Sequence, residues 1–159
     1  MGSPRVAPWL SFTACLAAGC ATTVATLPET SSLDRRRPIL EAEWRRDAND
    51  AALLAALGDA DPTLRVQALR ALARIEEVGT STLVEPLLRD ADAQVATWAA
   101  FAVGQIDDPS SIDALLRALD GASPVPDRVL FALGRIGTTT TAAQIGPRLE
   151  DRRPEVRAA

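Results

Sequence analysis

The feature of the sequence that most constrains its fold is a unit that recurs about every 30 residues. The unit occupies residues 59–75, 90–106 and 120–136, and a fourth copy opens at residue 151. Its corresponding apolar positions hold Leu64, Val95, Val125 and Val156, then Ala71, Ala102 and Ala132, then Leu72, Val103 and Leu133, then Ile75, Ile106 and Ile136. Self-similarity at such a period is typical of solenoids, so the architecture can be predicted before any single element.

Each unit has the pattern of two helices joined by a turn. First helices are predicted over residues 50–57, 81–89, 109–119 and 139–149, and second helices over residues 62–75, 93–106 and 124–136. The residues predicted to cap these starts are Asn49, Thr80, Asp108 and Thr138, and Asp61, Asp92 and Ser123. Pro86 and Pro147 are expected to kink their first helices. The predicted fold is all-α, an α-solenoid of helical hairpins with about three complete repeats and a truncated fourth.

We expect a cap helix at the N-terminal end of the array and an incomplete repeat at its C-terminal end. Residues 38–47 are predicted to form an N-terminal cap helix that begins at Pro38, with Ile39, Leu40 and Trp44 as its apolar side. At the other end, the unit that opens at residue 151 stops after about one and a half helical turns. The apolar positions that should follow are absent, so we expect the sequence to be a fragment of a longer chain.

The second helices resemble HEAT-like repeats, in particular the short bacterial kind of phycobilisome lyases. That pattern is an Asp turn followed by V-R-x-x-A-A-x-A-L-G-x-I, and residues 95–106, VATWAAFAVGQI, follow it except at Ala96. The neighbouring units depart from it at Ala73 and Pro126. The resemblance covers residues 49 to 159 and implies an α-solenoid; it implies no single function, since such arrays serve many roles.

The N-terminus resembles a bacterial lipoprotein signal. Residues 1–19 combine Arg5, an apolar run and small residues before Cys20, and Leu16-Ala17-Ala18-Gly19-Cys20 is similar to a lipobox. The resemblance implies acylation of Cys20, with residues 20–37 as a tether and residues 38–159 as the solenoid. Ala21 implies an outer-membrane protein that faces the periplasm. An ordinary cleaved signal with an incidental cysteine is the alternative.

The amino-acid composition argues against several classes of function. The chain has no His, no Lys and no Tyr, which leaves no Ser-His or Cys-His nucleophile, no Schiff base and no P-loop. A net charge of −4 argues against nucleic acid as a partner. The Asp pairs 59/61 and 90/92 could suggest Ca²⁺, but they lack the calcium-loop spacing and suit helix capping. We therefore predict no catalytic residue, no metal and no cofactor within this chain.

What remains is a surface for a protein or peptide partner. Equivalent positions that point away from the predicted core hold Arg70, Phe101 and Phe131, and the positions around them hold Trp98, Arg128 and Arg135. These rings either face a partner or pack between repeats. The predicted function is a membrane-anchored, non-catalytic binding scaffold. Two alternatives stay open: the front of a longer enzyme, resembling lipoproteins in which such an array precedes a cyclophilin-type peptidylprolyl isomerase domain, and an envelope-structural protein.

Overall fold

The computed structural model describes residues 32–121, 123–137 and 139–149, and every regular element in these ranges is helical. The elements are α1 (Ser32–Arg45), α2 (Ala51–Leu57), α3 (Pro62–Ile75), α4 (Ser81–Val84), the 3-10 helix η1 (Glu85–Arg89), α5 (Ala93–Ile106), the 3-10 helix η2 (Pro109–Ser111), α6 (Ile112–Asp120), α7 (Pro126–Ile136) and α8 (Thr139–Leu149). The predicted all-α solenoid is confirmed.

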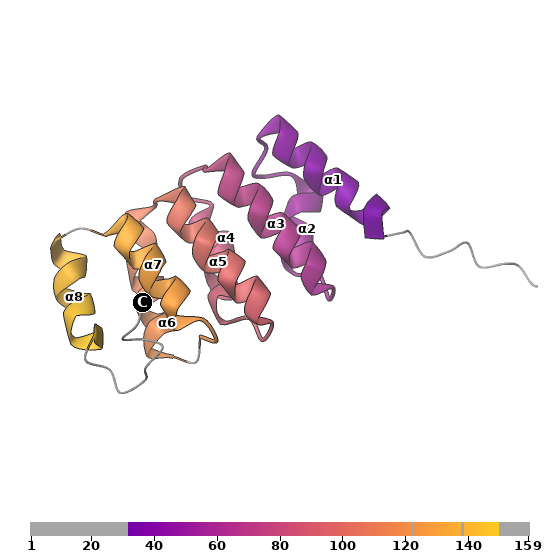
Figure 1. Cartoon of the computed structure of the whole chain (residues 1–159). Helices are drawn as coiled ribbons and strands as arrows, with labels where there is room; N and C mark the ends of the chain where they lie inside the picture. The colour runs from indigo at the N-terminus through magenta and orange to yellow at the C-terminus, as the bar shows by residue number, and fades with distance from the viewer. Residues whose placement is uncertain (1–31, 122, 138, 150–159) are drawn as a thin grey trace, which may run out of the picture.

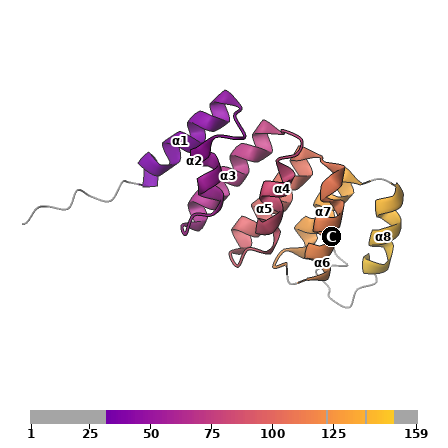
Figure 2. The same ribbon diagram turned by 180° about the vertical axis from the view of Figure 1, so that it is seen from behind.

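The helices form two rows (Figure 1). Helices α1, α3, α5 and α7 pack side by side in one row, and α2, α4 and α6 lie behind it, as the reverse view in Figure 2 also shows. Each helix of the first row contacts the one before it and the one after it, so the chain advances by one helix pair per repeat. This nearest-neighbour packing is what defines a solenoid.

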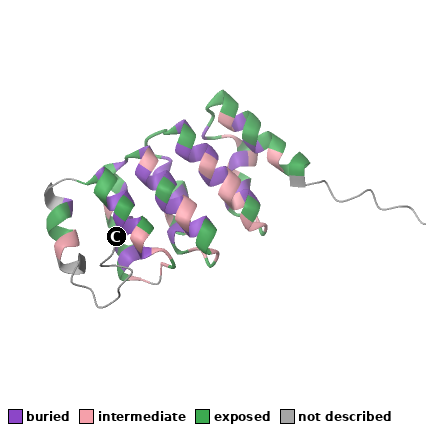
Figure 3. Ribbon diagram, in the orientation of Figure 1, coloured by how far each residue is buried: buried purple, intermediate pink, exposed green. Residues whose placement is uncertain are grey.

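The recurring apolar positions of the sequence form the core between the rows. Ala71, Ala102 and Ala132 are fully buried, as are Leu72, Val103 and Leu133. Figure 3 shows that buried segments recur along the helices of the front row. Small residues let neighbouring helices approach closely. A Cβ added to Gly104 would lie 3.4 Å from the Cα of Ala132, so α5 and α7 lie close together at this position. The register read from the sequence is therefore the register of the core.

Aspartates cap the second helices, as predicted. Asp61 Oδ1 accepts the N–H of Thr63, and Asp92 Oδ1 accepts the N–H groups of Gln94 and Val95. Such side-chain caps satisfy donors that the first helical turn leaves free. Within the described residues no cluster of three or more acidic, Cys or His side chains is arranged to hold a metal ion.

Three of the predicted caps are wrong. Thr80 precedes α4, but its side chain makes no capping hydrogen bond and its hydroxyl donates to the carbonyl of Glu77. Helix α2 is capped by Asp50, whose Oδ1 accepts from Ala52 and Leu53, rather than by Asn49. Helix α7 begins at Pro126 after Val125, and the Ser123 hydroxyl instead donates to the carbonyl of Leu88. Pro126 fixes the first-turn φ without a side-chain cap, so the helix begins two residues later than the sequence predicted. Thr138 lies outside the described residues.

The first helices are less regular than predicted. Residues 81–89 are divided into α4 and the 3-10 helix η1 at Pro86, because proline supplies no N–H to continue the α-helical ladder. Residues 109–111 form η2 before α6 begins at Ile112. Pro147, in contrast, lies within α8, which is one α-helix from Thr139 to Leu149, so the helix is not divided there.

Helix α1 begins at Ser32 rather than at Pro38, which corrects both the predicted cap helix and the predicted tether over residues 32–37. The arginines of that stretch belong to the helix. Arg37 pairs with Asp34 at 3.7 Å, one turn away, and Arg35 forms a salt bridge with Asp59 of the next repeat. These ion pairs, with an acidic residue in the first turn, favour a helix where composition alone suggested a linker.

The repeat that relates α1 to α3 is 30 residues long, one residue shorter than the 31-residue repeat that relates α3 to α5. Three helices of the front row end in left-handed residues, Arg46, Glu76 and Asp107, with φ of 54°, 55° and 56°. In this register Trp44 corresponds to Arg74, not to the buried Ile75. The predicted apolar side of α1 is therefore wrong in part: Ile39 is buried, but Leu40 is 49% and Trp44 90% exposed.

The outer side of α1 is polar. The buried Leu64, Ala68, Ala71 and Ile75 of α3 correspond, 30 residues earlier, to the exposed Asp34, Pro38, Glu41 and Arg45 of α1. A helix with the backbone position of a repeat but a polar outer face is what the end of a solenoid requires. Helix α1 thus has the chemistry of a capping helix.

Several predictions fall on residues outside the described ranges. The predicted signal peptide over residues 1–19, Cys20 and the start of the fourth unit at residue 151 are among them. In the part of the chain that the structure describes, no helix has the length and apolar character needed to cross a membrane.

Candidate partner-binding surface

The exposed side of the front row carries three side chains from each of its four helices, and we call this set the front strip. Its members are Arg37, Leu40 and Trp44 of α1, Gln67, Arg70 and Arg74 of α3, Trp98, Phe101 and Gln105 of α5, and Arg128, Phe131 and Arg135 of α7. All are exposed or half-buried. Of the six residues predicted from the sequence as a partner-binding set, all but Arg135 line two hollows that share Trp98 and Phe101.

The rings of α5 and α7 face solvent rather than the space between repeats. Phe101 is 40% and Phe131 56% exposed, although both lie on helices whose inner sides are fully buried. With Trp98, Thr97 and Arg128 they line a hollow of about 420 Å³, which we call the C-terminal hollow. Of the two arrangements that the sequence left open, the exposed one is observed.

Trp98 is fixed by its neighbours on both sides. Its ring meets Phe101 edge to face, with centroids 5.3 Å apart and planes at 83°. The guanidinium of Arg70, one repeat earlier, lies 5.1 Å from the Trp98 ring centroid. Edge-to-face and cation–π contacts of this kind hold an aromatic residue in one orientation without burying it.

A second hollow of about 390 Å³ lies on the other side of Trp98, and we call it the central hollow. Arg70, Arg74, Ala73, Glu76, Trp98, Phe101 and Gln105 line it. Because Trp98 and Phe101 line both hollows, the two lie next to each other on either side of these rings. The front strip thus carries neighbouring hollows rather than a set of separate sites.

The arginines of the front strip differ in the hydrogen bonds and salt bridges that they form within the protein. Arg135 Nε donates to the carbonyl of Gly104 at 3.0 Å, and Arg74 forms a salt bridge with Glu43 of α1. Arg128 is exposed and contacts Asp127, its sequence neighbour, at 3.3 Å. Surface pairs of this kind are weak and exchange readily with a partner's carboxylates. Arg70 and Arg128 flank the rings most directly.

Sequence reasoning missed Leu40 and Trp44 as members of the strip. The 31-residue period that relates α3 to α5, applied to α1, predicts that both are core residues. With Arg46, Glu43 and Arg74 they line a third hollow of about 500 Å³, the N-terminal hollow. The signal that could have identified them is the 30-residue register, in which Leu40 corresponds to Arg70, and so to Phe101 and Phe131.

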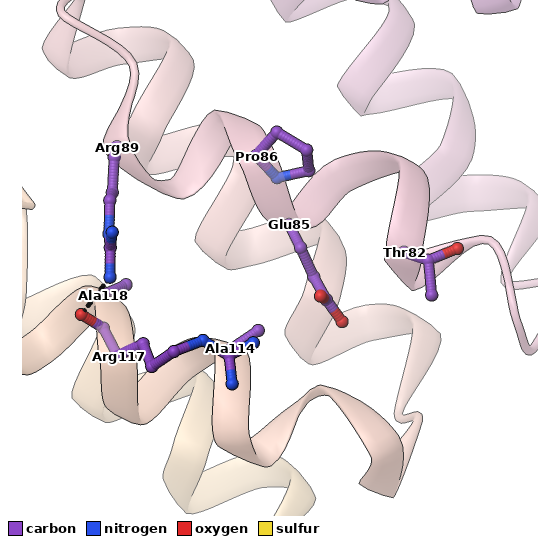
Figure 4. Close-up of a pocket in the computed structure, with 7 residues that line it drawn as sticks. All are labelled: Thr82, Glu85, Pro86, Arg89, Ala114, Arg117 and Ala118. Atoms are coloured by element: carbon purple, nitrogen blue, oxygen red, sulfur yellow. Dashed lines mark hydrogen bonds between the residues drawn. The ribbon is translucent and has the colours of Figure 1, made fainter.

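A further hollow lies on the back row, between η1 and α6 (Figure 4). It is lined by Thr82, Glu85, Pro86, Arg89, Ala114, Arg117 and Ala118. Its polar groups serve the fold: Arg89 donates to the carbonyl of Arg117, and Glu85 accepts from Ser111 at 3.1 Å. No aromatic side chain lines it, so it lacks the anchors that the front strip has.

The carboxylates with lowered pKa values are structural. The backbone N–H of Asp61 and the Arg35 guanidinium lower the pKa of Asp59, and the Thr63 hydroxyl and N–H lower that of Asp61. Hydrogen bonds from Ser81 and Ser110 lower the pKa of Asp108.

Asp108 joins two repeats. It is only 7% exposed, and its Oδ2 accepts from Ser81 Oγ at 2.7 Å and from the N–H of Gly79 at 3.2 Å. Asp108 thereby fixes the loop before α4 to the start of η2.

Arg65, which stands at the Arg position of the HEAT-like sequence pattern, also links two neighbouring repeats. Arg65 Nη2 donates to Asp90 Oδ1 at 2.9 Å, and its Nη1 donates to the carbonyl of Asp59 at 2.7 Å. Both side chains of the pair are largely buried. In α5 and α7 the corresponding residues are Ala96 and Pro126, which cannot form such an arginine–aspartate salt bridge.

Comparisons with known proteins agree with this architecture. Residues 50–126 match the family model of HEAT repeats. Among solved structures, a chain in the complex of CpcE and CpcF of phycocyanin lyase from Nostoc sp. PCC7120 is similar, with 29% identity and a TM-score of 0.60 over 84% of this chain. The similarity covers 59% of that chain. No curated protein sequence shows significant similarity. Residues 50–126 therefore carry HEAT repeats, and the fold of the chain is similar to that of a chain in the phycocyanin lyase complex.

Proposed function

We propose that the chain is a non-catalytic binding module that captures a protein or peptide partner on the front strip. The observation that carries this proposal is the exposure of Phe101 and Phe131 at equivalent positions of neighbouring repeats, on the walls of one hollow. Aromatic and arginine side chains are the residues that most often dominate binding free energy at protein interfaces. A solenoid presents them in register on a rigid frame.

Two further observations support this proposal. The Trp98 ring is held by Arg70 and Phe101, so a partner would meet an ordered aromatic surface and would lose little side-chain entropy on binding. The similar solved structure is a complex of two proteins, which is in keeping with a repeat surface that serves association. That structure belongs to a lyase, and a supporting subunit of an enzyme complex is the second candidate function.

Site-specific photocrosslinking tests the proposal in the cells that produce the protein. A photoreactive phenylalanine analogue replaces Phe131 in one variant and Leu83 of α4 in the control; Leu83 is also exposed but lies outside the front strip. We expect a discrete crosslinked species only with the probe at position 131. Crosslinks of equal intensity at both positions, or at neither, would contradict a specific partner surface on the front strip.

We propose in addition that Cys20 anchors the module to the envelope membrane through lipid. The support is the lipobox-like sequence Leu16-Ala17-Ala18-Gly19-Cys20. Two or more acyl chains on one residue give the lasting attachment that a single chain does not give. Outer-membrane attachment facing the periplasm follows from Ala21 as part of the same proposal.

A further inference from the structure

The front strip does not end at the rings of α5 and α7. On α1, Leu40 and Trp44 expose apolar surface, and Trp44 has 90% of its side chain exposed. They line the N-terminal hollow together with Arg74, which also lines the central hollow. The central and C-terminal hollows share Trp98 and Phe101, so the three hollows lie in a row from α1 to α7, and we call this row the groove.

The chemistry of this groove changes along its length. The N-terminal hollow offers Leu40 and Trp44, and the C-terminal hollow offers Phe101 and Phe131. Between them, Arg70 and Arg74 of α3 occupy the positions that carry apolar side chains on α1. The groove is therefore apolar at both ends, while its middle carries Arg70, Arg74 and Glu76, with Arg74 paired to Glu43.

The charge of the groove is opposite to that of the molecule. Four arginines and two glutamates line the three hollows: Arg46, Arg70, Arg74 and Arg128, with Glu43 and Glu76. The chain as a whole carries a net charge of −4. A basic groove on an acidic protein favours an acidic ligand over other segments of similar apolarity.

We infer that the groove binds a single extended peptide segment with two apolar anchors separated by acidic residues. One anchor enters the N-terminal hollow against Trp44, the other enters the C-terminal hollow between Phe101 and Phe131, and the intervening carboxylates face Arg70 and Arg74. This inference rests on the proposed function and names the chemistry of its partner.

The spacing of the anchors follows from the repeat. The two end hollows are two helix layers apart, which at 8–10 Å per layer is roughly 20 Å. An extended chain rises about 3.3 Å per residue, so the anchors should be separated by about six residues. Apolar side chains in a helical ligand would recur every three or four residues and would meet the arginines of α3.

A random 12-residue peptide library displayed on phage, selected against the full chain, tests the inference without knowledge of the natural partner. We expect enriched sequences to hold two aromatic or aliphatic residues about six positions apart with Asp or Glu between them. Fluorescein-labelled copies of the enriched peptides then serve as probes for anisotropy measurements. Binding should weaken at high salt, because the central contacts are between opposite charges.

The variants separate the inference from the proposed function. Trp44→Ala and Phe131→Ala should each weaken binding of the two-anchor peptide by roughly tenfold or more, whereas Leu83→Ala should leave it unchanged. If Phe131→Ala weakens binding but Trp44→Ala does not, the two-anchor inference is wrong and the proposed function stands. If no peptide is enriched, or neither variant changes the affinity, both are wrong.

Discussion

Single residues on one helix of this solenoid differ sharply in what they contribute. On α7, Leu133 is fully buried between the rows, while Phe131, two residues earlier, has more than half of its side chain exposed. The larger apolar residue is thus the one that contributes less to the core. A large aromatic residue kept at the surface, where a polar one would serve solubility, is a property of binding surfaces.

Truncation of these two residues should separate folding from binding. We expect Phe131→Ala to change the free energy of unfolding by less than about 1 kcal/mol, as exposed substitutions do. Leu133→Ala, the matched core variant, should cost about 2–5 kcal/mol. Urea unfolding followed by circular dichroism measures both. A loss of several kcal/mol for Phe131→Ala would return this ring to the core and remove the main support for the groove.

Asp108 predicts a pH dependence of stability. Its pKa lies below the usual 3.8 because Ser81 and Ser110 donate hydrogen bonds to its carboxylate. The folded state therefore binds a proton at Asp108 less readily than the unfolded state does. The stability that this carboxylate contributes is complete above pH 3.8 and is lost as the pH falls through the folded-state pKa.

Asp108→Asn should lower the free energy of unfolding by about 1–3 kcal/mol at pH 7, because the amide nitrogen cannot accept the bonds that the carboxylate accepts. The difference from the unaltered protein should shrink below pH 3.8. Urea unfolding at pH 7 and pH 3 measures it, with Asp113→Asn as the exposed control. A difference that is the same at both pH values would show that the carboxylate charge is not the cause.

At the scale of elements, most helix bounds could be predicted from sequence, and the larger differences are at α1, at the α4–η1 segment, at the η2–α6 segment and at the start of α7. Helices α3 and α5 have the predicted bounds, since their apolar period, their Asp caps and their tertiary packing all favour the same residues. Near prolines these signals disagree. Pro38 was expected to start α1 and lies inside it, while Pro86 ends α4 as an α-helix.

The left-handed residues at the helix ends could not be predicted, because none of the three is a glycine. Arg46, Glu76 and Asp107 adopt the conformation that helix ends in other proteins usually assign to glycine. In α3 the N–H of Glu76 donates to the carbonyl of Leu72 and closes the last turn. The hydrogen bond depends on the backbone alone, while the side chain adds steric cost.

Glu76→Gly should therefore stabilise the protein, by roughly 0.5–1 kcal/mol, since glycine adopts positive φ without a Cβ clash. Glu77→Gly is the matched control, because Glu77 is also exposed but is not among the positive-φ residues. Thermal and urea unfolding measure both variants. The explanation fails if Glu76→Gly is no more stable than Glu77→Gly.

At the scale of the whole molecule, the candidate site was predictable wherever the repeat register was correct. Phe101 and Phe131 could be placed on one strip because α5 and α7 share that register. Leu40 and Trp44 could be placed there only in the 30-residue register, since a shift of one residue moves a side chain by about 100° around a helix and so from the core to the surface. The packing of α1 on α3, which sequence does not report, determines that register.

For the whole molecule we also predict that the array is attached to a membrane through an acylated Cys20. If Cys20 is acylated, expression of the chain in a Gram-negative host should give a product that takes up labelled palmitate and sediments with membranes. Cys20→Ala should abolish the label and release the protein into the soluble fraction. Cys15→Ala is the matched control, since Phe12-Thr13-Ala14 before it does not resemble a lipobox.

The two cysteine variants also show which alternative holds if acylation of Cys20 is not observed. Because these are the only cysteines of the chain, label that persists in Cys20→Ala but disappears in Cys15→Ala would move the anchor to Cys15. Absence of label in every variant, with a soluble product, would favour an ordinary cleaved signal. In that case the groove on α1, α3, α5 and α7 would bind its partner from a freely diffusing module, and its affinity would lack the gain in effective concentration that a shared membrane supplies.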